Sequence, residues 1–203
     1  IEIEETRPFV GRITERAAAL TVVEEMLNGS GCVLTVEGEA GIGKSRLLRE
    51  IASGARWRGA IVLQGQASET PGASPFSPLV EALMPLINSP RGRQLETLLN
   101  RETLALLAPI NPAWNAEAAS MDSSFEQDSR RFHNALNLFG ETLAKFTPIV
   151  LMLDDLHWAN SVLWECLRSF ALGFARQGGL LILAYRRADL ERTSGWKMVQ
   201  AWD

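Results

Sequence analysis

Gly38-Glu39-Ala40-Gly41-Ile42-Gly43-Lys44-Ser45 contains a glycine, four further residues and then Gly-Lys-Ser, which is the pattern of a phosphate-binding loop. An apolar run at residues 32–36 precedes this segment, and residues 44–56 follow it with apolar side chains at helical spacing. A strand, a glycine-rich turn and a helix in this order bring backbone N–H groups and the positive end of a helix dipole to one point. The alternative is a glycine-rich turn that caps an ordinary helix, and the flanking strand and helix favour the phosphate loop.

Each part of this loop has an expected role in holding the phosphates of a nucleotide. Its glycines allow the backbone to fold around a phosphate, so that successive N–H groups point at anionic oxygens. We expect Lys44 to reach the β- and γ-phosphates and to act in catalysis, and the Ser45 hydroxyl to bind Mg²⁺. The residues predicted to bind the cofactor here are Gly38, Gly41, Ile42, Gly43, Lys44, Ser45 and Arg46.

Two acidic residues follow a later apolar run. Residues 149–153 are all apolar and lead directly into Asp154 and Asp155. In open α/β sheets, ligands bind at the edge formed by the carboxyl ends of the strands. We expect Asp154 to hold Mg²⁺ through its water shell and Asp155 to polarise an attacking water. Alone, an apolar run that ends in two acids is a weak signal, and its value comes from the phosphate loop on another strand.

The periodicity of the remaining sequence predicts an α/β fold. Short apolar runs predict strands at residues 32–36, 60–63, 149–153 and 180–185. Helical spacing predicts helices at residues 13–28, 44–56 and 161–175, and Asn160 is a suitable cap for the last one. Unbroken apolar strands separated by helices are typical of a parallel sheet that is covered on both faces. We therefore expect a three-layer architecture with a parallel sheet in the middle.

Residues 79–146 are predicted to form a helical insertion between the second and third strands. Prolines at positions 85, 90, 109 and 112 are expected to break it into several helices, and Ser123 with Glu126 has the spacing of a capping box before the last one. We interpret residues 1–203 as a single nucleotide-binding domain. Ile1 stands in place of a methionine and Asp203 follows no helix stop, so we expect that this domain is cut from a longer protein at both ends.

Composition narrows the classes of partner. The net charge of −4 and the pI near 5.4 give no electrostatic case for nucleic-acid contact by this segment. The apolar runs are too short to cross a membrane and no secretion signal is present, so we expect a cytoplasmic protein with reduced Cys32 and Cys166. The two histidines, His133 and His157, are too few for a metal site, and His157 is interpreted as a structural contact. Without an Asn-Lys-x-Asp motif for guanine, ATP is the expected nucleotide.

The chain carries four motifs in order: Arg7-Pro8-Phe9-Val10-Gly11-Arg12, then GEAGIGKS, LDDLHWA and LILAYR. Together they resemble the nucleotide-binding domain of the STAND branch of the AAA-type ATPases. The likeness is greatest to bacterial members found in large LuxR-type transcription regulators, in multidomain kinases and beside adenylate cyclase domains. It covers about residues 7–190 and implies a P-loop NTPase fold of the ASCE/AAA-like kind, with ATP or ADP and Mg²⁺ as cofactors.

The resemblance also implies roles for residues outside the phosphate loop. Phe9, Val10 and Arg12, in the N-terminal segment 1–12, match residues that line the adenine pocket. Arg186, just after the fourth strand, matches the polar sensor of the γ-phosphate and is counted among the catalytic residues. The alternatives at this position are a solvated arginine at a strand end, or the neighbouring Arg187 as the sensor.

Three functions follow from this reading. The first is a signalling switch that ADP keeps closed and ATP opens, with slow Mg²⁺-dependent hydrolysis, in a larger regulatory protein. Its expected partners are effector or sensor domains of the same protein and, after nucleotide exchange, further copies of itself. The second function is a mechanically active AAA+ ATPase that works on DNA or protein. The third is a nucleotide-binding scaffold without catalysis.

Overall fold

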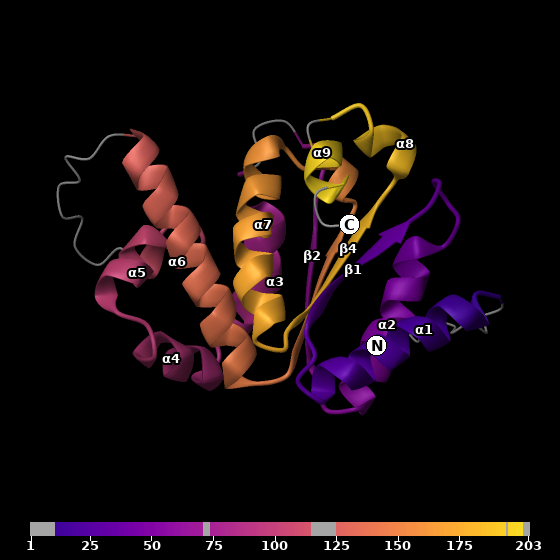
Figure 1. The fold of residues 1–203 in the computed structure, drawn as a ribbon, viewed down its shortest axis with the longest axis horizontal. Coiled ribbons are helices and arrows are strands. Elements are labelled where there is room, and N and C mark those ends of the chain that lie inside the picture. The colour runs from indigo at the N-terminus through magenta and orange to yellow at the C-terminus, as the bar shows by residue number, and fades with distance from the viewer. Residues whose placement is uncertain (1–10, 71–73, 115–124, 194, 201–203) are drawn as a thin grey trace, which may run out of the picture.

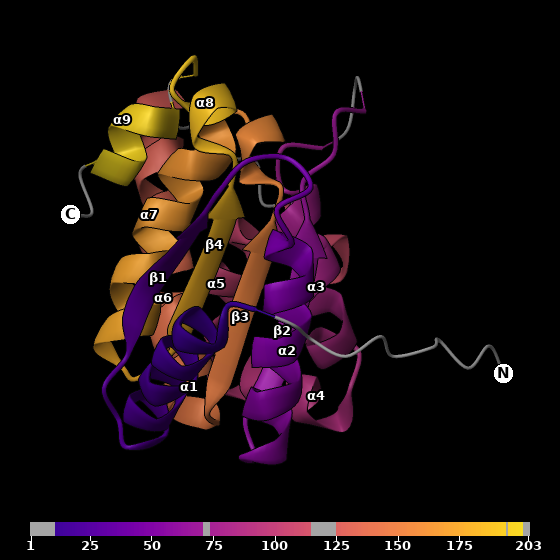
Figure 2. The same ribbon diagram turned by 90° about the vertical axis from the view of Figure 1, so that its right-hand side faces the viewer.

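A central parallel sheet organises the chain in a computed structural model of the protein. The structure describes residues 11–70, 74–114, 125–193 and 195–200, and for residues 125–128 it describes the backbone alone. The strands are β1 (Cys32–Glu37), β2 (Ile61–Gln66), β3 (Ile149–Asp154) and β4 (Leu180–Tyr185). They pair in parallel in the order β1-β4-β3-β2 (Figure 2). The predicted α/β class and parallel sheet are therefore confirmed. The second strand runs three residues further than expected, to Gln66.

Helices cover both faces of this sheet, which gives the three layers (Figure 1). On one face, α1 (Ile13–Leu27) and α2 (Lys44–Trp57) pack on alternate strand residues such as Val150 and Met152. On the other, α3 (Ser77–Ile87), α6 (Phe125–Phe146) and α7 (Ser161–Arg176) pack on Leu151, Leu153 and their neighbours. The side chains of β3 and β4 are buried on both faces, which explains why residues 149–153 and 180–185 are apolar without alternation. The edge strands β1 and β2 differ, because they carry exposed polar residues such as Thr35 and Gln64.

The strand order produces a switch point at the carboxyl edge of the sheet. The chain leaves β1 toward α2 on one face, whereas it leaves the adjacent β4 toward α8 (Arg187–Leu190), whose Leu190 packs on the opposite face. Adjacent strands whose connections diverge in this way leave a crevice for ligands. Because β4 lies between β1 and β3, the phosphate loop and the two acids approach this crevice from opposite sides.

Residues 79–146 are mostly helical, as predicted, but one proline behaves differently from the prediction. The segment contains α4 (Pro90–Thr97), α5 (Arg101–Leu106) and the short η1 (Pro112–Trp114) before α6. Pro85 lies inside α3 and does not break it, because it is exposed in the last turn, where water can solvate the freed carbonyl group. Ser123 of the expected capping box lies outside the described residues.

Other local features agree with the sequence patterns. Asn160 caps α7, since its Oδ1 accepts a hydrogen bond of 2.9 Å from the Leu163 N–H. Cys32 and Cys166 are free thiols, and burial raises the pKa of Cys166 to about 12. The chain continues through η2 (Leu156–Trp158) after β3 and α9 (Gly195–Gln200) after α8. Among the described helices, none has both the length and the apolar character required to cross a membrane.

Close packing of α6 against α7 depends on two glycines. A Cβ atom on Gly140 would lie 2.6 Å from the Phe170 carbonyl oxygen, and one on Gly173 would overlap the carbonyl oxygen of Asn137.

We predict that Gly173→Ala lowers the free energy of unfolding by about 1–3 kcal/mol, although alanine is the better helix former by roughly 1 kcal/mol. Urea unfolding of this variant, compared with Leu172→Ala at the exposed neighbouring position, measures the effect; a Gly173→Ala variant as stable as the wild type would refute the close contact.

Candidate functional site

The segment between β1 and α2 has the backbone shape expected of an anion-binding loop. Gly41 and Gly43 adopt left-handed conformations with φ of 72° and 94°, which side chains disfavour. Gly43 is also the residue immediately before α2, so the loop delivers the N-terminal N–H groups of that helix to the switch point. Gly38 has no room for a larger residue without displacing Ile42, whose Cγ2 would lie 3.0 Å from an added Cβ.

Lys44 connects the two ends of this loop. Its side chain is buried, and its Nζ donates hydrogen bonds of 2.7 Å to the Gly38 carbonyl and 2.9 Å to the Glu39 carbonyl. Burial lowers the pKa of Lys44, and the nearby Arg186 lowers it further, while Asp154 and Asp155 act in the opposite direction. The site therefore concentrates positive charge from two elements, which suits a polyanionic ligand.

Ser45 and Asp154, the two predicted Mg²⁺ contacts, line the same cavity of about 330 Å³ between the start of α2 and the ends of β2 and β3. Gln66 and Glu81 add polar atoms to its wall. A hydroxyl and a carboxylate fit Mg²⁺, which prefers oxygen ligands and keeps several waters or phosphate oxygens around it. The described residues contain no group of three or more His, Cys, Asp or Glu side chains that would hold a metal by themselves. Such a group is not expected where phosphates complete the coordination.

Asp155 is held in an uncommon conformation beside this cavity. Its φ is 54°, and its N–H donates to Asp154 Oδ1 at 2.7 Å. Its Oδ2 accepts a hydrogen bond of 2.8 Å from Nε2 of Gln66, which lies opposite Asp154 in the β2–β3 register. Gln66 is a site residue that the sequence did not reveal, because the predicted second strand ended at Leu63. The strand pairing is the signal that identifies it.

The two arginines after β4 have different surroundings. Arg186 is partly buried and lies 3.7 Å from Asp189 Oδ2, and its charge influences Lys44. Arg187 is more exposed: its Nε donates to Glu191 at 2.8 Å and its guanidinium lies 5.0 Å from the centroid of the Trp196 ring. These contacts engage Arg187 at the surface, so Arg186 is the better placed of the two to act on a phosphate.

The remaining predicted cofactor residues are only partly described. Phe9 and Val10 lie outside the described residues, and Arg12 immediately precedes α1 with a φ of 52°. Ile42 is 48% exposed, and Arg46, in the first turn of α2, forms a 4.0 Å ion pair with Glu50. The structure thus brings Lys44, Ser45, the two acids and Arg186 to one edge, while an adenine pocket is not part of the described geometry.

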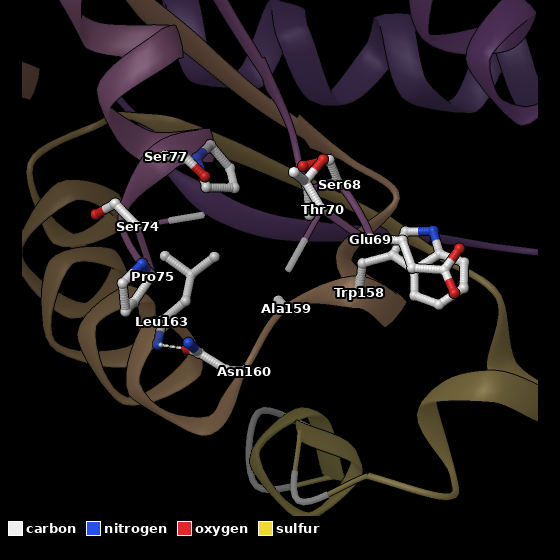
Figure 3. A pocket seen from close by; sticks show the side chains of 12 residues that line it. Ser68, Glu69, Thr70, Ser74, Pro75, Ser77, Trp158, Ala159, Asn160 and Leu163 are labelled. Atoms are coloured by element: carbon white, nitrogen blue, oxygen red, sulfur yellow. Dashed lines mark hydrogen bonds between the residues drawn. The ribbon is translucent and has the colours of Figure 1, made fainter. Parts of the chain in front are cut away.

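A second cavity has a volume of about 230 Å³ and is lined by no residue predicted to bind nucleotide. Ser68, Glu69 and Thr70, which follow β2, form one part of its wall, and Trp158 to Asn160 form another (Figure 3). Ser74, Pro75 and Ser77 form a third part of the wall (Figure 3). Pro78 and Leu163 also line the cavity. The hydroxyl groups of its lining all come from residues 68–70 and 74–77, whereas the opposite wall comes from residues 158–163, so no local motif predicted the cavity.

The sequence of the chain is similar to those of known proteins. Residues 8–183 match the protein family described as the AAA ATPase domain. An uncharacterized protein of Rhizobium meliloti (strain 1021) is also similar, with 26% identity over 190 residues, which are 88% of this chain. The chain spans 18% of the length of that relative.

The left-handed glycine before α2 gives a prediction about the loop. Gly43→Ala has open space for the methyl group but must keep a φ of 94°, so we expect a loss of stability of roughly 1–2 kcal/mol. We also expect weaker binding of inorganic triphosphate, because a relaxed backbone would redirect the loop N–H groups. Urea unfolding and calorimetric titration test both effects, with Ser53→Ala on the exposed face of α2 as the control. Unchanged stability and unchanged affinity would contradict this account of the loop.

Proposed function

Because the chain belongs to the AAA ATPase domain family, we propose that it binds ATP and ADP with Mg²⁺ and works as a nucleotide-operated switch of the STAND type. The observation that carries the proposal is that Lys44 binds the carbonyl groups of the glycine-rich loop next to the cavity that Ser45 and Asp154 line together. The motif order Arg7–Arg12, phosphate loop, Asp-Asp-Leu-His-Trp-Ala and Arg186 supports the STAND assignment.

In this proposal, different residues bind the phosphates, bind the metal and promote hydrolysis. Loop N–H groups and Lys44 hold the β- and γ-phosphates, and Ser45 with Asp154 positions the metal. A Mg²⁺ ion held there would neutralise negative charge on the phosphates. Asp155 accepts a hydrogen bond from the water that attacks the γ-phosphorus, and Arg186 stabilises the charge on the transferred group.

Slow turnover is part of this proposal. This expectation follows from the STAND resemblance, in which hydrolysis resets the switch and is slow. The coverage of only 18% of the Rhizobium meliloti relative supports a place within a larger protein. We propose that effector and sensor domains of that protein, and its self-association, depend on whether ADP or ATP is bound.

The nucleotide assignment is tested by titrating the chain with ATP, ADP and GTP, with and without Mg²⁺. We predict adenine-selective binding that Lys44→Ala weakens by about 100-fold or more, since charge-assisted hydrogen bonds contribute about 1.5–3 kcal/mol each. Lys145→Ala, which removes an exposed lysine in the last turn of α6, is the matched control. Equal affinities of the wild type and Lys44→Ala for Mg-ATP would overturn the assignment.

Asp155→Asn separates binding from hydrolysis. Asparagine tolerates the left-handed backbone and can still accept from Gln66, so the variant should fold and bind Mg-ATP normally. We predict that kcat falls by about 100-fold or more, because the lost charge acts on the attacking water in the transition state. Phosphate-release kinetics with parallel calorimetry measure the two effects. Unchanged turnover in the variant would overturn the role of Asp155. Absence of wild-type turnover would favour a non-hydrolysing scaffold, whereas fast wild-type turnover in a ring would favour the mechanical ATPase.

A further inference from the structure

His157 is a buried polar side chain that the proposed mechanism does not yet use. It lies in η2, its side chain is fully buried, and neither Nδ1 nor Nε2 has a hydrogen-bond partner. Nε of Arg186 is likewise buried without a partner. Buried polar groups without partners cost free energy and are uncommon in folded proteins, so two of them in adjacent elements require an explanation.

The imidazole lies close to Asp155 and within the electrostatic influence of Arg186, the two residues proposed to act in hydrolysis. Its Nδ1 is 3.9 Å from Asp155 Oδ1, just beyond hydrogen-bond length, and η2 packs against α8 and the end of β4, where Arg186 is located. Burial lowers the pKa of His157, and the charge of Arg186 lowers it further, against the opposite effects of Asp155 and Asp189. The ring is therefore neutral near pH 7, with one N–H donor and one acceptor nitrogen.

We propose that His157 is a positioning residue that couples Asp155 to Arg186 when Mg-ATP is bound. Its Nδ1–H donates to the Asp155 carboxylate and its Nε2 accepts from the Arg186 Nε–H. This inference rests on the proposed function, because it assigns His157 to the same nucleotide site. A movement of about 1 Å brings the 3.9 Å separation to hydrogen-bond length.

The chemistry of the three side chains fits this arrangement. A neutral imidazole presents a donor and an acceptor on opposite sides, which matches a carboxylate on one side and a guanidinium on the other. Gln66 already holds Oδ2 of Asp155, so a bond from His157 to Oδ1 would fix the carboxylate from both sides. The position of Arg186 on the γ-phosphate would then determine the orientation of the group that polarises the water.

Imidazole nitrogen spectroscopy tests the proposal on the unmodified chain. Only His133 and His157 are present, so selective ¹⁵N-histidine labelling gives two ring signals, and His133→Gln assigns them. His133 serves as an internal reference, since its Nδ1 lies 3.0 Å from Ser169 Oγ between α6 and α7. Addition of Mg²⁺ with a non-hydrolysable ATP analogue should give a His157 ring protonated at Nδ1, with new shifts at both nitrogens. A ring protonated at Nε2 alone, or unchanged signals despite binding, would overturn the coupling and leave the nucleotide assignment intact.

Variants supply the kinetic test. His157→Phe keeps an aromatic ring, somewhat larger than imidazole, but removes both nitrogens, so kcat should fall by about 10- to 100-fold while the Kd for Mg-ATP changes little. His157→Asn retains an amide donor near the Nδ1 position and should recover part of kcat, whereas His133→Phe should leave kcat unchanged. Parallel losses of binding and turnover in His157→Phe without recovery in His157→Asn would show a structural role only. Absence of Mg-ATP binding by the wild type would remove the proposed function, and this coupling with it.

Discussion

The pairing of β4 with both β1 and β3 is the constraint on which the site depends. These strands come from distant parts of the chain, and no local interaction brings them together. Once β4 lies between them, the loop that leaves β1 and the acids that end β3 meet at one edge, with Arg186 between them. The buried apolar faces of the strands hold this order, because shifting a strand by one residue would exchange the side chains that face the two helical layers.

Local patterns were sufficient to predict most elements and the phosphate loop. The loop is recognisable because its glycines, lysine and serine are adjacent in sequence and their roles depend on local backbone geometry. Pro85 was misjudged for a physical reason: a proline disrupts a buried helix interior more than an exposed last turn, and exposure depends on packing. The hydrogen bond between Gln66 and Asp155 depends on strand register, which a single sequence does not reveal.

The choice between Arg186 and Arg187 shows the same limit. Both residues follow the same strand, and their charges are identical in sequence. Only the fold shows that Glu191 and Trp196 engage one of them at the surface, while the other shares the electrostatic environment of Lys44. The burial of His157 could likewise not be predicted from the periodicity of apolar residues, because it results from the packing of η2 against α8 and β4. Two residues that are adjacent in sequence can therefore differ in their contacts, because their side chains lie in different surroundings at the end of the strand.

The two hydrogen bonds from Lys44 to the loop carbonyls affect how such a site exchanges ligands. An ammonium group has three N–H donors, and two of them hold the loop in shape, which leaves one for a phosphate oxygen. A diphosphate could take this free N–H without the loss of either loop bond, whereas the contacts proposed for Lys44 with both the β- and γ-phosphates of a triphosphate require it to release one loop carbonyl. Under the proposed function, the exchange of ADP for ATP therefore changes a hydrogen bond that holds the loop, in addition to the contacts proposed for Asp155 and Arg186.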